Sequence, residues 1–142
     1  MWFGFLKRDD ASVAVSEPMD IPWEKNDKGR FWKLLMVRPS TLGIAGRGGV
    51  AAFFHRGVKP GWVFVCATDD LGALLDAAQD DKGIMDYEAR GGVYVTWSFV
   101  KPEFREGVAR HLRDVLRPEV ADSGLDGHRA YAVEAVPVNP PN

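Results

Sequence analysis

Two short apolar runs joined by a turn-forming segment most strongly limit the folds open to this chain. The runs cover residues 50–55 and 62–67, and the segment between them contains Gly57, Pro60 and Gly61. Glycine and proline in such a segment favour a chain reversal, and each run has the length of a short strand. The sequence therefore predicts a β-hairpin over residues 50–67.

Helices and further strands are predicted on both sides of this hairpin. Leu71, Leu74, Leu75 and Ala78 recur at helical spacing over residues 71–79, after aspartates that suit a helix N-cap. Similar patterns predict strands over 31–37, 93–100 and 130–136, a glycine-rich loop over 39–49, and helices over 84–90 and 102–117. We expect an α/β (α+β) domain over residues 31–142, with helices flanking a small sheet. Prolines in residues 1–30 favour an extended N-terminal arm.

Composition narrows the class of protein. The chain has 142 residues, of which 46% are hydrophobic and 27% charged, and this is typical of one globular domain. Its 18 basic and 20 acidic residues give a net charge of −2, which argues against strong non-specific binding of nucleic acid. We expect no membrane span and no signal peptide, and the single cysteine fits a reducing compartment. These features favour a cytoplasmic location, or one at the cytoplasmic face of a membrane complex.

Several short motifs between residues 46 and 141 carry a resemblance to a known family. They are Gly49-Val50, Gly92-Val93-Tyr94-Val95-Thr96-Trp97, Gly107-Val108 with His111-Leu112, Leu116 with Pro118, and Pro137-Val138-Asn139-Pro140. With these motifs on a hairpin, a helix, a third strand and a long helix, the chain resembles the GIY-YIG endonuclease superfamily. More narrowly, it resembles a group of bacterial GIY-YIG-like proteins. The resemblance implies a GIY-YIG-like fold and does not cover the N-terminal arm.

The resemblance also implies where the catalytic groups of that family would lie. Its first-strand tyrosine falls on Ala51, its second-strand motif on Phe64-Val65-Cys66, its helical arginine on Leu74 and its metal-binding glutamate on Ala109. Alanine and leucine supply no proton, no charge and no metal ligand. The resemblance therefore implies a pseudoenzyme without catalytic residues, and we expect neither a metal nor a cofactor.

Other residues with reactive side chains are few. His55, His111 and His128 do not have the spacing of a metal site. Cys66 lies in an apolar run, which is typical of a small buried side chain, and the alternative is a thiolate partnered by His55 across the hairpin. The glycine-rich segment 43–49 precedes a strand rather than a helix, so it lacks the context of a phosphate-binding loop.

Arginines mark one candidate surface. Arg110, Arg113 and Arg117 fall on one stripe of the long predicted helix, where they could contact phosphates or an acidic partner. Acidic residues are interleaved with them, so a solvated helix face is the simpler interpretation. Together with Arg47 and Arg56, they would serve a nucleic-acid-binding module, which is our second hypothesis.

The start of the chain is a second candidate surface. Trp2, Phe3, Phe5 and Leu6 form an apolar cluster followed by two basic residues. Aromatic side chains of this kind suit a pocket on a partner protein. Our first hypothesis is therefore a non-catalytic adaptor that docks into a larger protein assembly through this cluster and Trp23. A third hypothesis is a peripheral membrane protein that inserts residues 1–8 into a membrane surface.

Overall fold

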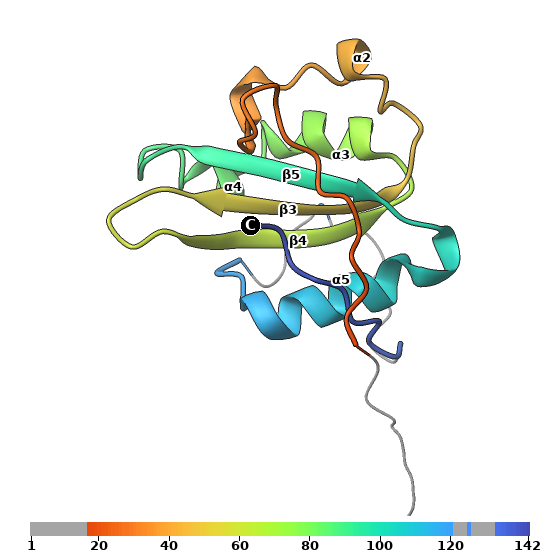
Figure 1. Ribbon diagram of the computed structural model, residues 1–142. Coiled ribbons are helices and arrows are strands. Elements are labelled where there is room, and N and C mark those ends of the chain that lie inside the picture. The colour runs from red at the N-terminus through yellow and green to blue at the C-terminus, as the bar shows by residue number, and fades with distance from the viewer. Residues whose placement is uncertain (1–16, 121–124, 126–132) are drawn as a thin grey trace, which may run out of the picture.

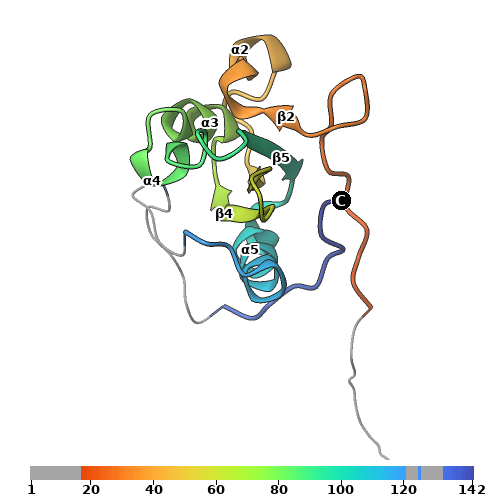
Figure 2. The ribbon, with the colours of Figure 1, turned by 90° about the vertical axis from the view of Figure 1, so that its left-hand side faces the viewer.

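A four-stranded antiparallel sheet forms the centre of the molecule (Figure 1). The computed structural model describes residues 17–120, 125 and 133–142. The strands are β2 (Trp32–Lys33), β3 (Gly49–His55), β4 (Gly61–Thr68) and β5 (Val93–Phe99), in the spatial order β2-β5-β3-β4. Helices α2 (Pro39–Leu42), α3 (Leu71–Ala78) and α4 (Lys82–Met85) lie on one face, and α5 (Pro102–Leu116) lies on the other (Figures 1 and 2). The predicted α+β class, with helices flanking a small sheet, is confirmed.

The two faces of the sheet bury two separate core layers. The larger layer lies on the side of α3 and includes Phe53, Leu75 and Trp97, which are almost inaccessible to solvent. The smaller layer lies on the side of α5 and is built from short side chains such as Val50 and Ala52. Removing these apolar surfaces from water supplies the main favourable free energy of folding.

The elements with the clearest local signals form as expected. The predicted hairpin is β3 paired with β4, and its register shifts between Phe53 and Phe54. Helix α5 begins with Pro102 and ends at Leu116, and the next residue, Arg117, has a left-handed backbone with φ of 52°. The N–H groups in the first turn of a helix have no partner within the helix, so proline, which lacks an N–H, loses no hydrogen bond there. Proline thus marks the start of the long helix, and a left-handed residue followed by Pro118 marks its end.

The start of α3 also follows the expected chemistry. The Asp70 carboxylate accepts hydrogen bonds from the Ala73 N–H at 3.0 Å and from the Gly46 N–H at 2.8 Å. These two bonds, in that order, lower the pKa of Asp70 below its usual 3.8. One side chain thus caps the helix and also holds the glycine-rich loop in place.

Four predicted elements differ from the structure. The strand expected over 31–37 is only Trp32–Lys33, because the chain then turns into a 3-10 helix (Leu34–Met36) that buries Leu34 in the larger core layer. The expected loop over 39–49 contains α2, and the helix expected over 84–90 is α4 followed by turns. Residues 130–132 of the last predicted strand lie outside the described residues. Residues 133–136 form no strand, since the Val136 N–H donates to the Gly107 carbonyl on α5 at 2.9 Å.

The described part of the arm packs on its own domain, and its residues 27–30 form a turn. Met19 forms a parallel bridge with Val138 near the end of the chain. Further along, the Glu24 N–H donates to the Trp97 carbonyl at 2.9 Å, and the Glu24 carbonyl accepts from the Thr96 hydroxyl at 2.7 Å. These bonds attach the arm to β5 just before the chain enters β2.

Candidate functional site

The apolar cluster proposed for partner binding divides into two parts. Trp2, Phe3, Phe5 and Leu6 lie outside the described residues. Trp23 is half-buried and packs against the smaller core layer, and its indole N–H donates to the Asn139 carbonyl at 2.9 Å. In this structure Trp23 therefore holds the arm against the C-terminal segment.

The five candidate arginines do not form one surface. Arg110 donates to the Val133 carbonyl at 2.6 Å, and Arg113 donates to the Val65 carbonyl at 3.3 Å. Both therefore attach α5 to neighbouring segments. Arg117 lies in the left-handed turn that ends α5.

Arg47 and Arg56 lie at different places on the sheet. The Arg47 guanidinium lies 3.6 Å from the centre of the Phe99 ring, at the far end of β5. Arg56 follows β3 at the hairpin turn, and its guanidinium lies 5.5 Å from the centre of the Tyr94 ring at the start of β5. Of the five arginines, only Arg56 lines the pocket described below.

Cys66 and His55 are not brought together. Cys66 is buried and pairs with Ala51 across the hairpin, four positions along β3 from His55. Four strand positions correspond to roughly 13 Å, which is too far for proton transfer between the two side chains. His55 instead contacts Glu119, with 2.8 Å between Nε2 and Oε2, and Tyr87 donates to the other oxygen of that carboxylate at 3.0 Å.

The positions that the resemblance assigns to catalysis are apolar and buried. Ala51, Phe64 and Leu74 belong to the core layer on the side of α3. Ala109 belongs to the layer on the side of α5. Groups on opposite faces of a sheet do not meet at one reacting atom, so these four positions do not form a common site in this structure.

A row of side chains crosses the end of the sheet face that carries α5. Cross-strand pairing places Lys33 beside Tyr94, Tyr94 beside Phe54, and Phe54 beside Trp62. Directly paired residues of antiparallel strands point to the same face, so these four side chains form one row. The rings of Phe54 and Trp62 are 5.1 Å apart, and Phe31 lies 6.3 Å and 6.0 Å from them. The row therefore makes a supported aromatic platform.

A tight loop from the arm brings cations over this platform. The Asn26 side-chain oxygen accepts from the Lys28 N–H at 2.9 Å and from the Arg30 N–H at 3.1 Å. The Asn26 N–H donates to the Arg30 carbonyl at 2.8 Å, and Gly29 takes the left-handed conformation with φ of 73°. This Asx-type turn leaves the side chains of the loop available to line the space beside the aromatic row.

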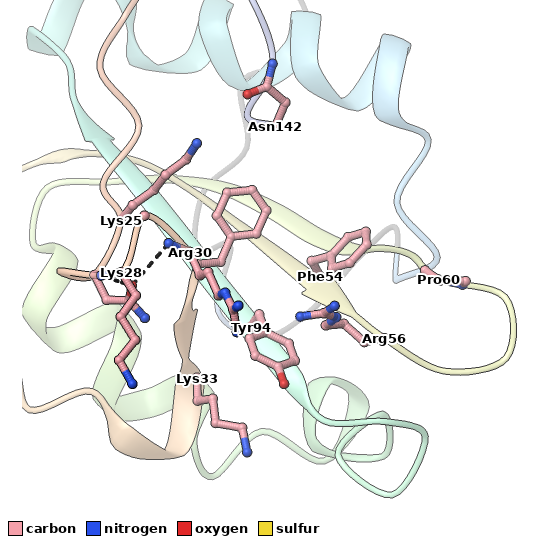
Figure 3. Close-up of a pocket in the computed structure, with 12 residues that line it drawn as sticks. Lys25, Lys28, Arg30, Lys33, Phe54, Arg56, Pro60, Tyr94 and Asn142 are labelled. Atoms are coloured by element: carbon pink, nitrogen blue, oxygen red, sulfur yellow. Dashed lines mark hydrogen bonds between the residues drawn. The ribbon is translucent and has the colours of Figure 1, made fainter.

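The loop and the row enclose a pocket of about 600 Å³ (Figure 3). Its lining includes the rings of Phe31, Phe54 and Tyr94. Five cationic side chains surround these rings, namely Lys25, Lys28, Arg30, Lys33 and Arg56. Figure 3 shows the four cations from residues 25–33 on one side of Tyr94 and Arg56 from the hairpin on the other. Among the described residues, no aspartate or glutamate lines this basic aromatic pocket.

Sequence reasoning missed most of this pocket. Of its cations, the sequence patterns single out only Arg56, and they place residues 24–30 in the extended arm. The available signal was the run Lys25, Lys28, Arg30-Phe31 and Lys33, in which basic residues surround an aromatic one. Its relation to Phe54 and Tyr94 depends on β5 lying between β2 and β3, which no local pattern encodes.

Comparisons supply no relative from which a function could be transferred. No model of a protein family, no curated protein and no solved structure matches the chain. The GIY-YIG resemblance therefore stays a prediction. In the described part of the chain, no helix has both the length and the apolar character needed to cross a bilayer. Within the same residues, His, Cys, Asp and Glu side chains form no group of three or more that could hold a metal ion.

Proposed function

We propose that this protein is a non-catalytic module that binds single-stranded nucleic acid in the basic aromatic pocket. One observation carries the proposal. Partly exposed rings at the end of a sheet are surrounded by five cations, and among the described residues no aspartate or glutamate side chain shares the lining. Proteins that bind single strands combine these two features, since bases stack on the rings and phosphates contact the cations.

The shape of the pocket favours a single strand over a duplex. The rings of Phe54 and Tyr94 form part of the lining of a pocket of about 600 Å³. A base reaches such rings only when it is unstacked, whereas the bases of a duplex are already stacked on one another. Stacking on an aromatic side chain contributes roughly 1–3 kcal/mol per base, so two rings matter to affinity.

Charge gives the pocket its preference for an anion. The chain as a whole carries a net charge of −2, but the five cations gather at one place. Exposed charges act over about 10 Å at 0.1 M salt, so a phosphate in the pocket responds mainly to these neighbours. The adaptor hypothesis rests mainly on side chains at positions 2–6, outside the described residues, and on Trp23, which packs on its own domain; it stays a prediction.

Fluorescence anisotropy with a labelled short oligothymidylate tests the proposal. We expect binding that weakens between about 50 and 200 mM salt and that exceeds the binding of a duplex of equal length. Phe54→Leu keeps an apolar side chain but removes the ring, so it should weaken binding. The matched control is Phe104→Leu on α5, where the phenylalanine is exposed and lies outside the pocket lining.

A charge variant separates this pocket from other anion-binding surfaces. Lys28→Gln should make the slope of log K against log salt less steep by about 0.7, the value for one lost contact to a single strand. The control Lys82→Gln removes another exposed lysine, on α4 and outside the pocket lining, and should leave the slope unchanged. If Arg110→Ala abolishes binding and Lys28→Gln has no effect, the binding site lies on α5 and the proposed pocket is wrong. Binding only to vesicles that contain phosphatidylserine, and not to the oligonucleotide, would overturn the proposal in favour of a membrane surface.

A further inference from the structure

A second hollow adjoins the basic aromatic pocket at the same end of the sheet. It has a volume of about 890 Å³ and lies between the β3–β4 turn and the turn that leads into β5. In Figure 1 these two turns lie at the same end of the sheet. Arg56 lines both spaces, so one guanidinium stands at their boundary. A ligand that leaves the first pocket past Arg56 therefore enters the second hollow.

The backbones of the two turns that form this hollow approach each other closely. Gly91 has φ of 98°, and a Cβ there would overlap the carbonyl of Arg56. A Cβ at Gly57 would lie 2.6 Å from the carbonyl of Arg90. Such close approach is open only to glycine. Arg56 and Arg90 are 34 positions apart in the chain, but their backbones are held next to each other.

The charges of the second hollow continue those of the first. Arg56, Lys59 and Arg90 are exposed and line the hollow. Its one carboxylate among the described residues, Glu119, already contacts His55 and Tyr87. These contacts direct the Glu119 carboxylate toward His55 and Tyr87, and the three cations outnumber this one acidic side chain in the lining.

Each space also places an arginine near a tyrosine ring. The Arg56 guanidinium is 5.5 Å from the centre of the Tyr94 ring in the first pocket. The Arg90 guanidinium is 5.0 Å from the centre of the Tyr87 ring beside the second hollow. An arginine that rests on an aromatic face keeps its N–H groups directed outward in a defined plane, which suits contact with phosphate.

We infer that the second hollow is a further nucleotide subsite, in which Arg90 and Lys59 bind the phosphate that follows the nucleotide held in the first pocket. The inference rests on the proposed function and extends it. The strand crosses from one subsite to the other at Arg56, so the smallest ligand that uses both subsites is a dinucleotide. The protein then distinguishes a continuous strand from a mononucleotide by length.

Isothermal titration calorimetry with a mononucleotide, a dinucleotide and a tetranucleotide of thymidine tests this inference. The wild-type protein should bind the dinucleotide and tetranucleotide more tightly than the mononucleotide. Arg90→Gln should abolish most of this gain while leaving mononucleotide binding unchanged. For the tetranucleotide, its slope of log K against log salt should be less steep by about 0.7. Lys82→Gln serves as the charge-matched control, and circular dichroism verifies that each variant is folded.

Nuclear magnetic resonance gives an independent measurement on the unmutated protein. Backbone amide signals of Arg90 and Gly91 should shift with the tetranucleotide but not with the mononucleotide. An equal length dependence in wild type and Arg90→Gln, or no shift at these amides, would overturn the second subsite and leave the first pocket standing. Failure of the wild-type protein to bind any of the oligonucleotides would instead overturn the proposed function itself.

Discussion

Gly107 offers a sharp test of how the C-terminal segment packs, because two opposing effects act at this position. Gly107 lies inside α5, where the C-terminal segment crosses the helix and the Val136 N–H donates to its carbonyl at 2.9 Å. A Cβ at this position would lie 2.6 Å from the Glu134 carbonyl oxygen and 2.6 Å from Val136 Cγ2. Real Cβ atoms do not approach backbone oxygens so closely, so Gly107→Ala must displace the segment or strain the helix.

The magnitudes decide the sign of the effect. Alanine is more favourable than glycine inside a helix by about 0.8–1.0 kcal/mol. Overpacking of a tight contact costs about 1–3 kcal/mol, and the Glu134 oxygen belongs to the backbone and cannot rotate away. We therefore expect Gly107→Ala to lower the free energy of unfolding by up to about 2 kcal/mol. For a chain of this length, each kcal/mol corresponds to roughly 2–4 °C in melting temperature.

Urea unfolding followed by far-ultraviolet circular dichroism measures this change. The control is Gly83→Ala on α4, where the nearest atom to a new Cβ is a side-chain oxygen of Asp81 at 3.3 Å rather than a backbone atom. This substitution should not lower the free energy of unfolding by more than about 0.5 kcal/mol. Val136→Ala in the Gly107→Ala background removes the Cγ2 contact and should recover part of the loss. If Gly107→Ala instead stabilises the protein by the full helix-propensity gain, the segment does not pack on α5 in solution.

Two further predictions concern the core and the contact between His55 and Glu119 near the second hollow. Leu75→Ala should lower the free energy of unfolding by about 2–5 kcal/mol, because this side chain of α3 is fully buried in the core. A loss below about 1 kcal/mol in urea unfolding would contradict that burial. The hydrogen bond to His55, followed by that to Tyr87, lowers the pKa of Glu119 below its usual 4.5. The ionised Glu119 side chain therefore stabilises the fold above pH 4.5, and this stabilisation is lost as the pH falls through the lowered pKa. Glu119→Gln should therefore flatten the dependence of urea stability on pH between about pH 5 and pH 3, and an unchanged profile would show that the contact with His55 is not maintained in solution.

The elements predicted correctly from the sequence are those with complete local signals. The hairpin follows from two apolar runs and the glycines and proline between them, and α5 follows from Pro102 at its start and Pro118 after its end. The strand over 31–37 was predicted too long because its apolar residues suit burial in either state. Leu34 and Val37 are both buried in the core layer on the α3 side. A strand would point these two side chains to opposite faces of the sheet, whereas a 3-10 turn places residues three apart on one side. Burial in the tertiary structure, rather than local preference, decided this segment.

The candidate site was less predictable than the fold. Arg110 and Arg113 formed a clear stripe in the sequence, but both hydrogen-bond to backbone carbonyls of neighbouring segments. No local sequence pattern contains both Lys28 and Tyr94, because 66 positions separate them in the chain. They line one pocket only because β5 lies between β2 and β3 and the arm is attached to β5 through Glu24. A sequence pattern within one helix or strand does not predict a site that depends on which strands become neighbours in the sheet.

Net charge is also a weak guide to function, because it does not tell where the fold brings charged side chains together. The value of −2 sums charges over the whole chain, and it led to the expectation of weak binding to nucleic acid. A bound phosphate, however, responds to charges within about 10 Å at 0.1 M salt. The fold places five cations around one pocket of about 600 Å³, and among the described residues no aspartate or glutamate side chain lines it. Two proteins with the same composition can therefore differ in their affinity for a single strand, and the salt dependence of Lys28→Gln measures the local arrangement directly.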